Sequence, residues 1–225
     1  MLVFLVPVGA DRYELYCEEP DEVLPADEAP SGVFRRLVHW FREMLAEAER
    51  ERRRGPSTDA PPAGFMSHLK ARTLRWVSES IAEQRLLWQL RGRVEAGLVY
   101  PDDLRAEQAI EILRRSLRRD FERHRFWLVI DSLGLIASAA LMLLPGPNLV
   151  AYYFAFRIVG HFLSVRGARQ GLSKVQWHQE ASAPLSALRA MVAVAPEARA
   201  ARVDAVAATL QLEHLASFFQ RTATL

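Results

Sequence analysis

The sequence predicts a mainly α-helical membrane protein with one transmembrane helical hairpin, cytoplasmic helices and a short N-terminal β-hairpin. Three observations support this fold class. Residues 126–165 are almost free of charge, with Asp131 and Arg157 as the exceptions, whereas the residues before them are rich in charge. In much of that charged part, apolar residues recur at the spacing of an α-helix. The first eight residues instead form a short apolar run that is followed by a Gly-containing turn.

The N-terminal region, residues 1–30, is predicted to contain a β-hairpin and an acidic loop. Residues 2–8 form the first expected strand, residues 9–12 the turn and residues 13–18 the return strand. The apolar start has no basic residues before it and is interrupted by Pro7, so it does not match an export signal. Its acidic continuation also argues against a cleaved mitochondrial presequence.

Residues 31–125 are predicted to form a cytoplasmic helical region. Helices are expected over residues 31–54 and 65–94, and a third is expected to start after Pro101 and to continue into the apolar stretch. Arginines alternate with glutamates at helical neighbours, which favours a solvated face over a nucleic-acid interface or a coiled coil.

Residues 126–172 are predicted to form the transmembrane hairpin. Residues 126–144 are 19 residues long, about the length that crosses a hydrocarbon core of roughly 30 Å. Residues 149–165 form the second expected span, and the two are joined by a turn of Pro145, Gly146, Pro147 and Asn148. Basic residues flank both spans, which predicts that both termini are cytoplasmic. The alternative is a buried hairpin within a soluble helical domain.

Polar residues inside this hairpin are the candidate functional site. Asp131 and His161 lie equally far from Gly146 along the chain, while Tyr153, Arg157 and His161 follow each other at every fourth position and share a helix face. We expect Asp131 to pair with Arg157, with His161 or with both. Two roles remain open: a proton or cation pathway, and a staple that fixes helix packing.

Small residues in and just after the second expected span suggest close helix packing. Gly160, Ser164, Gly167, Ala168 and Gly171 are typical of helix interfaces and favour self-association or a partner protein. Residues 173–225 are predicted to form amphipathic helices over residues 185–194 and 197–222. These helices either dock on the earlier helices or lie on a membrane surface.

The sequence contains no motif of a catalytic, phosphate-binding or metal-binding site. Cys17 is the single cysteine, which excludes an intramolecular disulfide and a multi-cysteine metal site. The expectation is therefore a protein that is not an enzyme, with no cofactor and no metal.

Residues 144–168 resemble the mitochondrial K+/H+ exchange-related family. The resemblance rests on the turn at residues 144–148, on the aromatic run and arginine up to Arg157, on the Gly160–His161 pair, and on Ser164, Gly167 and Ala168. It implies an inner-membrane protein associated with potassium/proton exchange and ion homeostasis, and it assigns matching positions to Arg157 and His161. The missing presequence favours a bacterial relative in the cytoplasmic membrane, with the mitochondrial inner membrane as the eukaryotic counterpart.

The expected function is a membrane-anchored component or regulator of potassium/proton exchange and cation homeostasis. The expected partners are the lipid bilayer, a second copy or a membrane partner protein, and K+ and H+ themselves, with no nucleic acid. The alternative function is a membrane-tethered helical scaffold that binds another protein and transports nothing.

Overall fold

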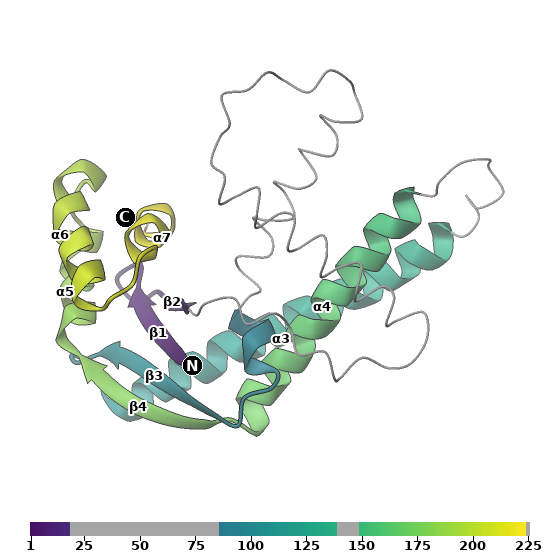
Figure 1. Ribbon diagram of the computed structural model, residues 1–225, viewed down its shortest axis with the longest axis horizontal. Coiled ribbons are helices and arrows are strands. Elements are labelled where there is room, and N and C mark those ends of the chain that lie inside the picture. The colour runs from purple at the N-terminus through teal and green to yellow at the C-terminus, as the bar shows by residue number, and fades with distance from the viewer. Residues whose placement is uncertain (19–85, 139–148, 224–225) are drawn as a thin grey trace, which may run out of the picture. The chain divides into compact units, whose positions relative to one another are not determined.

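The computed structural model describes residues 1–18, 86–138 and 149–223 (Figure 1). The chain separates into two compact units. The sheet unit contains the described residues 1–18, 90–121 and 168–223, and the helix-pair unit contains residues 86–89, 122–138 and 149–167. Two long helices, α3 (Ala106–Ser138) and α4 (Leu149–Ser173), contribute residues to both units.

A mixed four-stranded sheet organises the sheet unit, in the order β2-β1-β3-β4. β1 (Leu2–Pro7) pairs antiparallel with β2 (Tyr13–Tyr16), with Phe4 opposite Tyr16, so the predicted N-terminal hairpin is present. β1 also pairs parallel with β3 (Glu95–Pro101), and β3 pairs parallel with β4 (Gln176–Ser182). The hairpin therefore becomes stable by joining strands that are distant in sequence.

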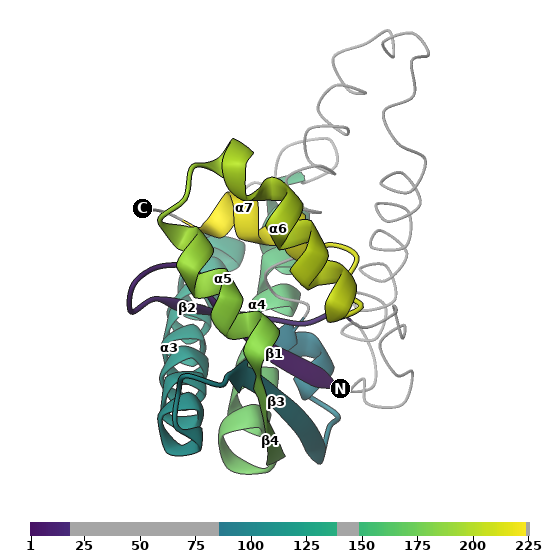
Figure 2. The ribbon, with the colours of Figure 1, turned by 90° about the vertical axis from the view of Figure 1, so that its left-hand side faces the viewer.

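Helices cover both faces of this sheet, which is why β1 is buried along almost its whole length. Phe4 and Val6 pack with α5 (Ala183–Val192), α6 (Pro196–Thr209) and α7 (Leu215–Thr222). Side chains alternate along a strand, so the fully buried Val3 and Leu5 belong to the opposite face. The first half of α3 lies on that side of the sheet (Figures 1 and 2).

A buried arginine joins the three C-terminal helices. The Arg199 side chain of α6 donates to the carbonyls of Met191 and Val192 at the end of α5, and to the carbonyl of Ala223 just after α7. Its guanidinium also lies 5.0 Å from the centre of the Phe219 ring. These backbone acceptors compensate part of the cost of burying the charge.

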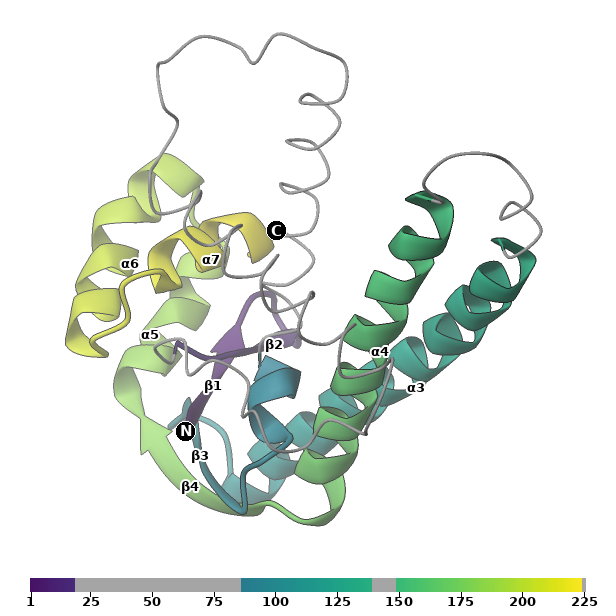
Figure 3. The ribbon, with the colours of Figure 1, turned by 45° about the vertical axis from the view of Figure 1, so that its right-hand side comes forward.

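In the helix-pair unit, α3 and α4 lie side by side (Figure 3). Residues 86–89, which belong to a short helical stretch, pack on α4 of the same unit. A Cβ added at Gly167 would lie 1.6 Å from the Leu87 carbonyl oxygen, so only glycine allows this approach of backbone to backbone. The Trp88 indole N–H donates to the Gly160 carbonyl at 3.2 Å and to the Ser164 hydroxyl at 3.0 Å.

The described end of α3 has its polar residues inside and its apolar residues outside. His124, Asp131 and Ser138 follow at intervals of seven residues and are buried. The large exposed apolar side chains on the same stretch are Phe126, Trp127, Val129, Ile130, Leu133 and Ile136. A helix in a soluble core normally shows the opposite arrangement.

The predicted transmembrane hairpin is wrong. Over residues 1–18, 86–138 and 149–223, no helix combines the length and the apolar character needed to cross a membrane. Two physical reasons are visible. Much of α3 is the charged stretch before Phe126, and its apolar part carries polar groups on one whole face. In α4, Arg157, Arg166 and Arg169 interrupt the apolar sequence.

The remaining differences from the predicted fold concern strands and helix ends. The helix expected up to residue 94 ends at residue 90, and β3 follows it, while β4 was not predicted at all. The single helix expected over residues 197–222 is divided into α6 and α7, with Gln211 between them at a positive φ of 57°. The helix expected over residues 31–54, the start of the one from residue 65, residues 139–144 and the turn from Pro145 to Asn148 lie outside the described residues.

Candidate proton-binding cluster

An ion pair connects α3 and α4 within the helix-pair unit. The Arg157 Nε donates to both carboxylate oxygens of Asp131, at 2.9 and 3.0 Å. The Asp131 side chain is 3% exposed and the Arg157 side chain 19% exposed, so the pair is largely shielded from water. Removing either partner would break this ion pair and leave the other, largely buried charge without it.

The other two predicted cluster residues lie on either side of this pair. His161 Nε2 is 3.3 Å from Asp131 Oδ2. The Tyr153 hydroxyl accepts from Arg157 Nη1 at 3.4 Å, and the guanidinium carbon is 5.6 Å from the centre of the Tyr153 ring. The structure therefore brings together all four residues that the sequence singled out. Trp127 adds a second aromatic ring, at 5.3 Å from the same guanidinium carbon.

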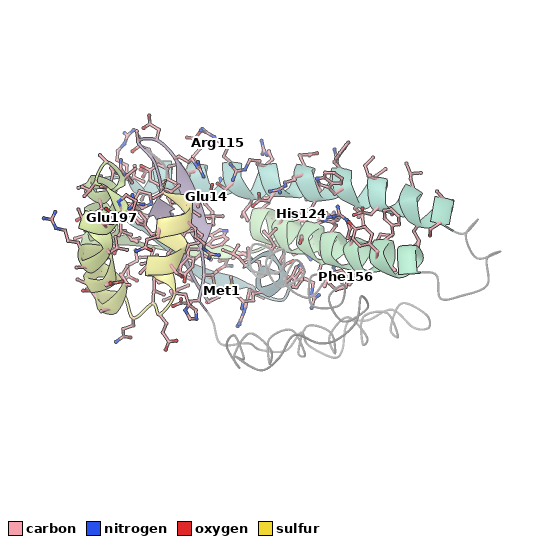
Figure 4. All side chains as sticks on the ribbon, turned by 90° about the horizontal axis from the view of Figure 1, so that it is seen from above. Met1, Glu14, Arg115, His124, Phe156 and Glu197 are labelled. Atoms are coloured by element: carbon pink, nitrogen blue, oxygen red, sulfur yellow. The ribbon has the colours of Figure 1, made fainter. Side chains whose placement is uncertain are left out.

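His124 belongs to the cluster and was missed by the sequence analysis. Its Nδ1 lies 2.8 Å from the Nδ1 of His161, and both rings are buried. Figure 4 labels His124 on α3, where its side chain faces α4. In the sequence His124 lies between Arg123 and Arg125, just before the apolar stretch, and the sequence analysis does not single it out. The available signal was its position seven residues before Asp131, which places both residues on one helix face.

Burial keeps the two histidines uncharged at neutral pH. It lowers the pKa of His124 to about 4, with smaller contributions from His161 and Arg123. It also lowers the pKa of His161 to about 4, and the positive charges of Arg157 and Arg123 act in the same direction. The carboxylate of Asp131 is already paired with Arg157, which offsets its attraction for a proton on His161.

The geometry suits proton binding better than metal binding. Within residues 1–18, 86–138 and 149–223 there is no group of three or more His, Cys, Asp or Glu side chains arranged to hold a metal ion. The two Nδ1 atoms are at hydrogen-bond distance from each other, and Asp131 is occupied by Arg157. Two imidazoles, a carboxylate and a guanidinium can bind, hold or pass a proton.

The predicted small residues of α4 pack within the chain. Gly160, Ser164 and Gly167 receive Leu87 and Trp88 in the helix-pair unit. In the sheet unit, Ala168 is fully buried and a Cβ at Gly171 would meet the side chains of Leu117 and Leu90 at 3.0 and 3.2 Å. The close packing that these residues predicted therefore serves contacts inside the protein, and self-association stays a prediction.

Comparison with curated proteins and with solved structures gave no match. A family model described as mitochondrial K+-H+ exchange-related matches residues 2–175. That range contains β1 to β3, the whole of α3 and α4 and all five residues of the cluster, including His124. Because the match covers well over half of the sequence, this chain belongs to the mitochondrial K+-H+ exchange-related family.

Proposed function

We propose that this protein is a component or regulator of potassium/proton exchange in which the buried cluster on α3 and α4 is the proton-responsive element. The observation that supports this most strongly is the contact of Asp131 with both Arg157 and His161 in the interior of the helix-pair unit. An ion pair in such a place is a costly means of holding two helices together. Protonation of His161 would add a positive charge directly beside Asp131.

The proposed place of action is a lipid surface, contacted by the exposed apolar face of α3. Phe126, Val129, Leu133 and Ile136 follow at spacings of three and four residues and form a continuous face. Arginines precede it, from Arg114 to Arg125, and the aromatic Phe126 and Trp127 stand at the border between the two. Basic residues beside aromatic and apolar residues suit contact with the anionic headgroups and the interfacial region of a lipid surface.

Potassium-dependent proton flux into proteoliposomes tests the proposal. The purified protein is compared with Arg157→Gln and His161→Ala, after equal incorporation of each has been verified. His178→Ala and Arg115→Gln are matched controls, because both residues are exposed and lie in the sheet unit. Flux that the cluster variants lose and the controls retain supports direct participation in exchange. No flux above that of empty liposomes rejects autonomous exchange and leaves a regulator.

A second candidate function is a helical scaffold that binds another protein through the same face of α3. The exposed apolar side chains favour it, because a surface of this kind on a soluble protein usually marks an interaction site. The two functions differ in their dependence on the cluster. A scaffold tolerates His161→Gln if the fold is kept, whereas a proton-responsive component does not.

A further inference from the structure

The unusual feature of the cluster is the direct contact of two histidine rings through the same type of nitrogen. His124 Nδ1 and His161 Nδ1 are 2.8 Å apart. One of them must carry a hydrogen and the other a lone pair, because two N–H groups facing each other at this distance would repel. The space between the rings therefore holds one proton.

The position of Asp131 determines which of the two rings donates the hydrogen bond between the Nδ1 atoms. Its Oδ2 faces His161 Nε2 at 3.3 Å, and a carboxylate oxygen opposite a ring lone pair would be repulsive. His161 therefore carries its hydrogen on Nε2, and its Nδ1 accepts the hydrogen bond. His124 must then donate from Nδ1. The two neutral rings have opposite tautomers, and the one ring nitrogen left to bind a further proton is His124 Nε2.

From this geometry we propose that His124 and His161 form a single proton-binding site, in which a proton bound at His124 is transferred to His161 and held beside Asp131. A proton binds at His124 Nε2, the His124 Nδ1–H bond breaks, and an Nδ1–H bond forms on His161. His124 is then neutral, and His161 is an imidazolium next to the carboxylate. One proton enters and no other group changes its protonation.

The charged groups around the pair limit it to one proton. Arg157 is bound to Asp131 from α4, and Arg123 lies close enough on α3 to lower the pKa of both rings. Tyr153 contacts Arg157. A second imidazolium would face the first across 2.8 Å with only one carboxylate nearby, so it is strongly disfavoured. The pair titrates as a unit.

This inference deepens the proposed function, since it names His124 as the residue through which the proton reaches the cluster. Its test does not depend on transport. The full-length protein with 15N-labelled histidines is studied by NMR, and His124→Gln and His161→Gln assign the ring signals. Exposed His178 serves as the internal reference.

At neutral pH the expected result is an Nδ1–H tautomer for His124 and an Nε2–H tautomer for His161. Asp131→Asn removes the carboxylate and is expected to abolish the preference of His161. The same tautomer on both rings, or a charged ring, overturns the proposal. This measurement needs no acid titration, so it stands even if the protein unfolds at low pH.

During acid titration both rings are expected to change with one common midpoint: His161 becomes an imidazolium, while His124 stays neutral and changes from the Nδ1–H to the Nε2–H tautomer. In His124→Gln, the midpoint of His161 is expected to move. Separate midpoints that are unaffected by the other ring's substitution contradict the proposal. Failure of the flux assay with coupled titration rejects autonomous exchange only, and uncoupled titration with intact flux rejects this inference only.

Discussion

The sheet unit and the helix-pair unit distribute polarity in opposite ways. In the sheet unit, apolar strands such as β1 are covered on both faces and most charges point outward. In the helix-pair unit, His124, Asp131 and His161 are buried while Phe126, Leu133 and Ile136 are exposed. The first arrangement is what the hydrophobic effect alone produces in water. The second arrangement needs a further explanation. We propose that the buried polar residues bind a proton and that the exposed apolar residues contact lipid.

The largest expected effect comes from breaking the buried ion pair. Asp131→Ala should lower the free energy of unfolding by about 3–5 kcal/mol, because the largely buried Arg157 loses its ion pair with Asp131. Asp204→Ala, at an exposed position of α6, is the control. Chemical denaturation measures both. A double variant, Asp131→Leu with Arg157→Met, should recover most of the lost free energy of unfolding. If this variant is stable but has no proton flux, the ion pair is needed for function and not only for packing.

A cavity in the sheet unit should have a comparable or slightly smaller effect. Leu5→Ala removes a fully buried side chain from β1 and should cost about 2–5 kcal/mol of unfolding free energy. Leu2→Ala, in the same strand but half exposed, should change it much less. Equal effects of the two substitutions in denaturation experiments would mean that this face of β1 is not covered as described.

The pH dependence of the free energy of unfolding should detect the buried, uncharged histidines of the cluster. The histidine pKa is about 4 in the folded state and about 6.5 in the unfolded state. Between these values the unfolded chain binds more protons, so stability is complete above pH 6.5 and falls as the pH is lowered towards 4. The loss between pH 6.5 and 5 is about 1.6 kcal/mol for one such histidine. Denaturation at a series of pH values should show a shallower slope in His161→Gln than in the wild type, and identical slopes would exclude buried neutral histidines.

The smallest effect on stability is expected on the apolar exterior of α3. Leu133→Gln changes an exposed residue, so the free energy of unfolding should change by less than about 0.5 kcal/mol. Binding to vesicles that contain anionic lipid should nevertheless fall clearly, as measured by flotation. Val94→Gln, an exposed apolar position in the sheet unit, is the matched control. Vesicle binding that Leu133→Gln leaves unchanged would reject the lipid contact.

Local patterns predicted what is local in this fold. The β1–β2 hairpin follows from a short apolar run and the turn at Gly9, where the Val8 and Gly9 N–H groups both donate to the Arg12 carbonyl. β4 was not predicted, because Gln176–Ser182 is mostly polar and, apart from the partly buried Trp177 and the buried Ser182, exposed. It is a strand because it pairs with β3, a contact between residues about eighty positions apart, and single-segment patterns do not contain such information.

The candidate site was predicted from the spacing of residues along the chain. That spacing found Asp131, Tyr153, Arg157 and His161 but not His124. Equal distances from Gly146 correctly placed Asp131 near His161. The same apolar stretch was interpreted as a membrane span, because hydropathy along the sequence does not distinguish an apolar face from an apolar helix. The structure shows that the face of α3 shared by Asp131 and His124 is buried and that His124 on it contacts His161.

The position of β1 in the sheet also has a consequence for synthesis of the protein. β1 is the inner strand between β2 and β3, yet β3 begins only at Glu95. At about 5–20 residues per second, a ribosome needs on the order of 5–20 s to reach β3 after making β1. During that time Val3, Leu5 and Val6 are exposed on a nascent strand with an unpaired edge. We therefore expect this segment to be a chaperone-binding site of the growing chain, and slow production of residues 19–94 to lower the yield of folded protein.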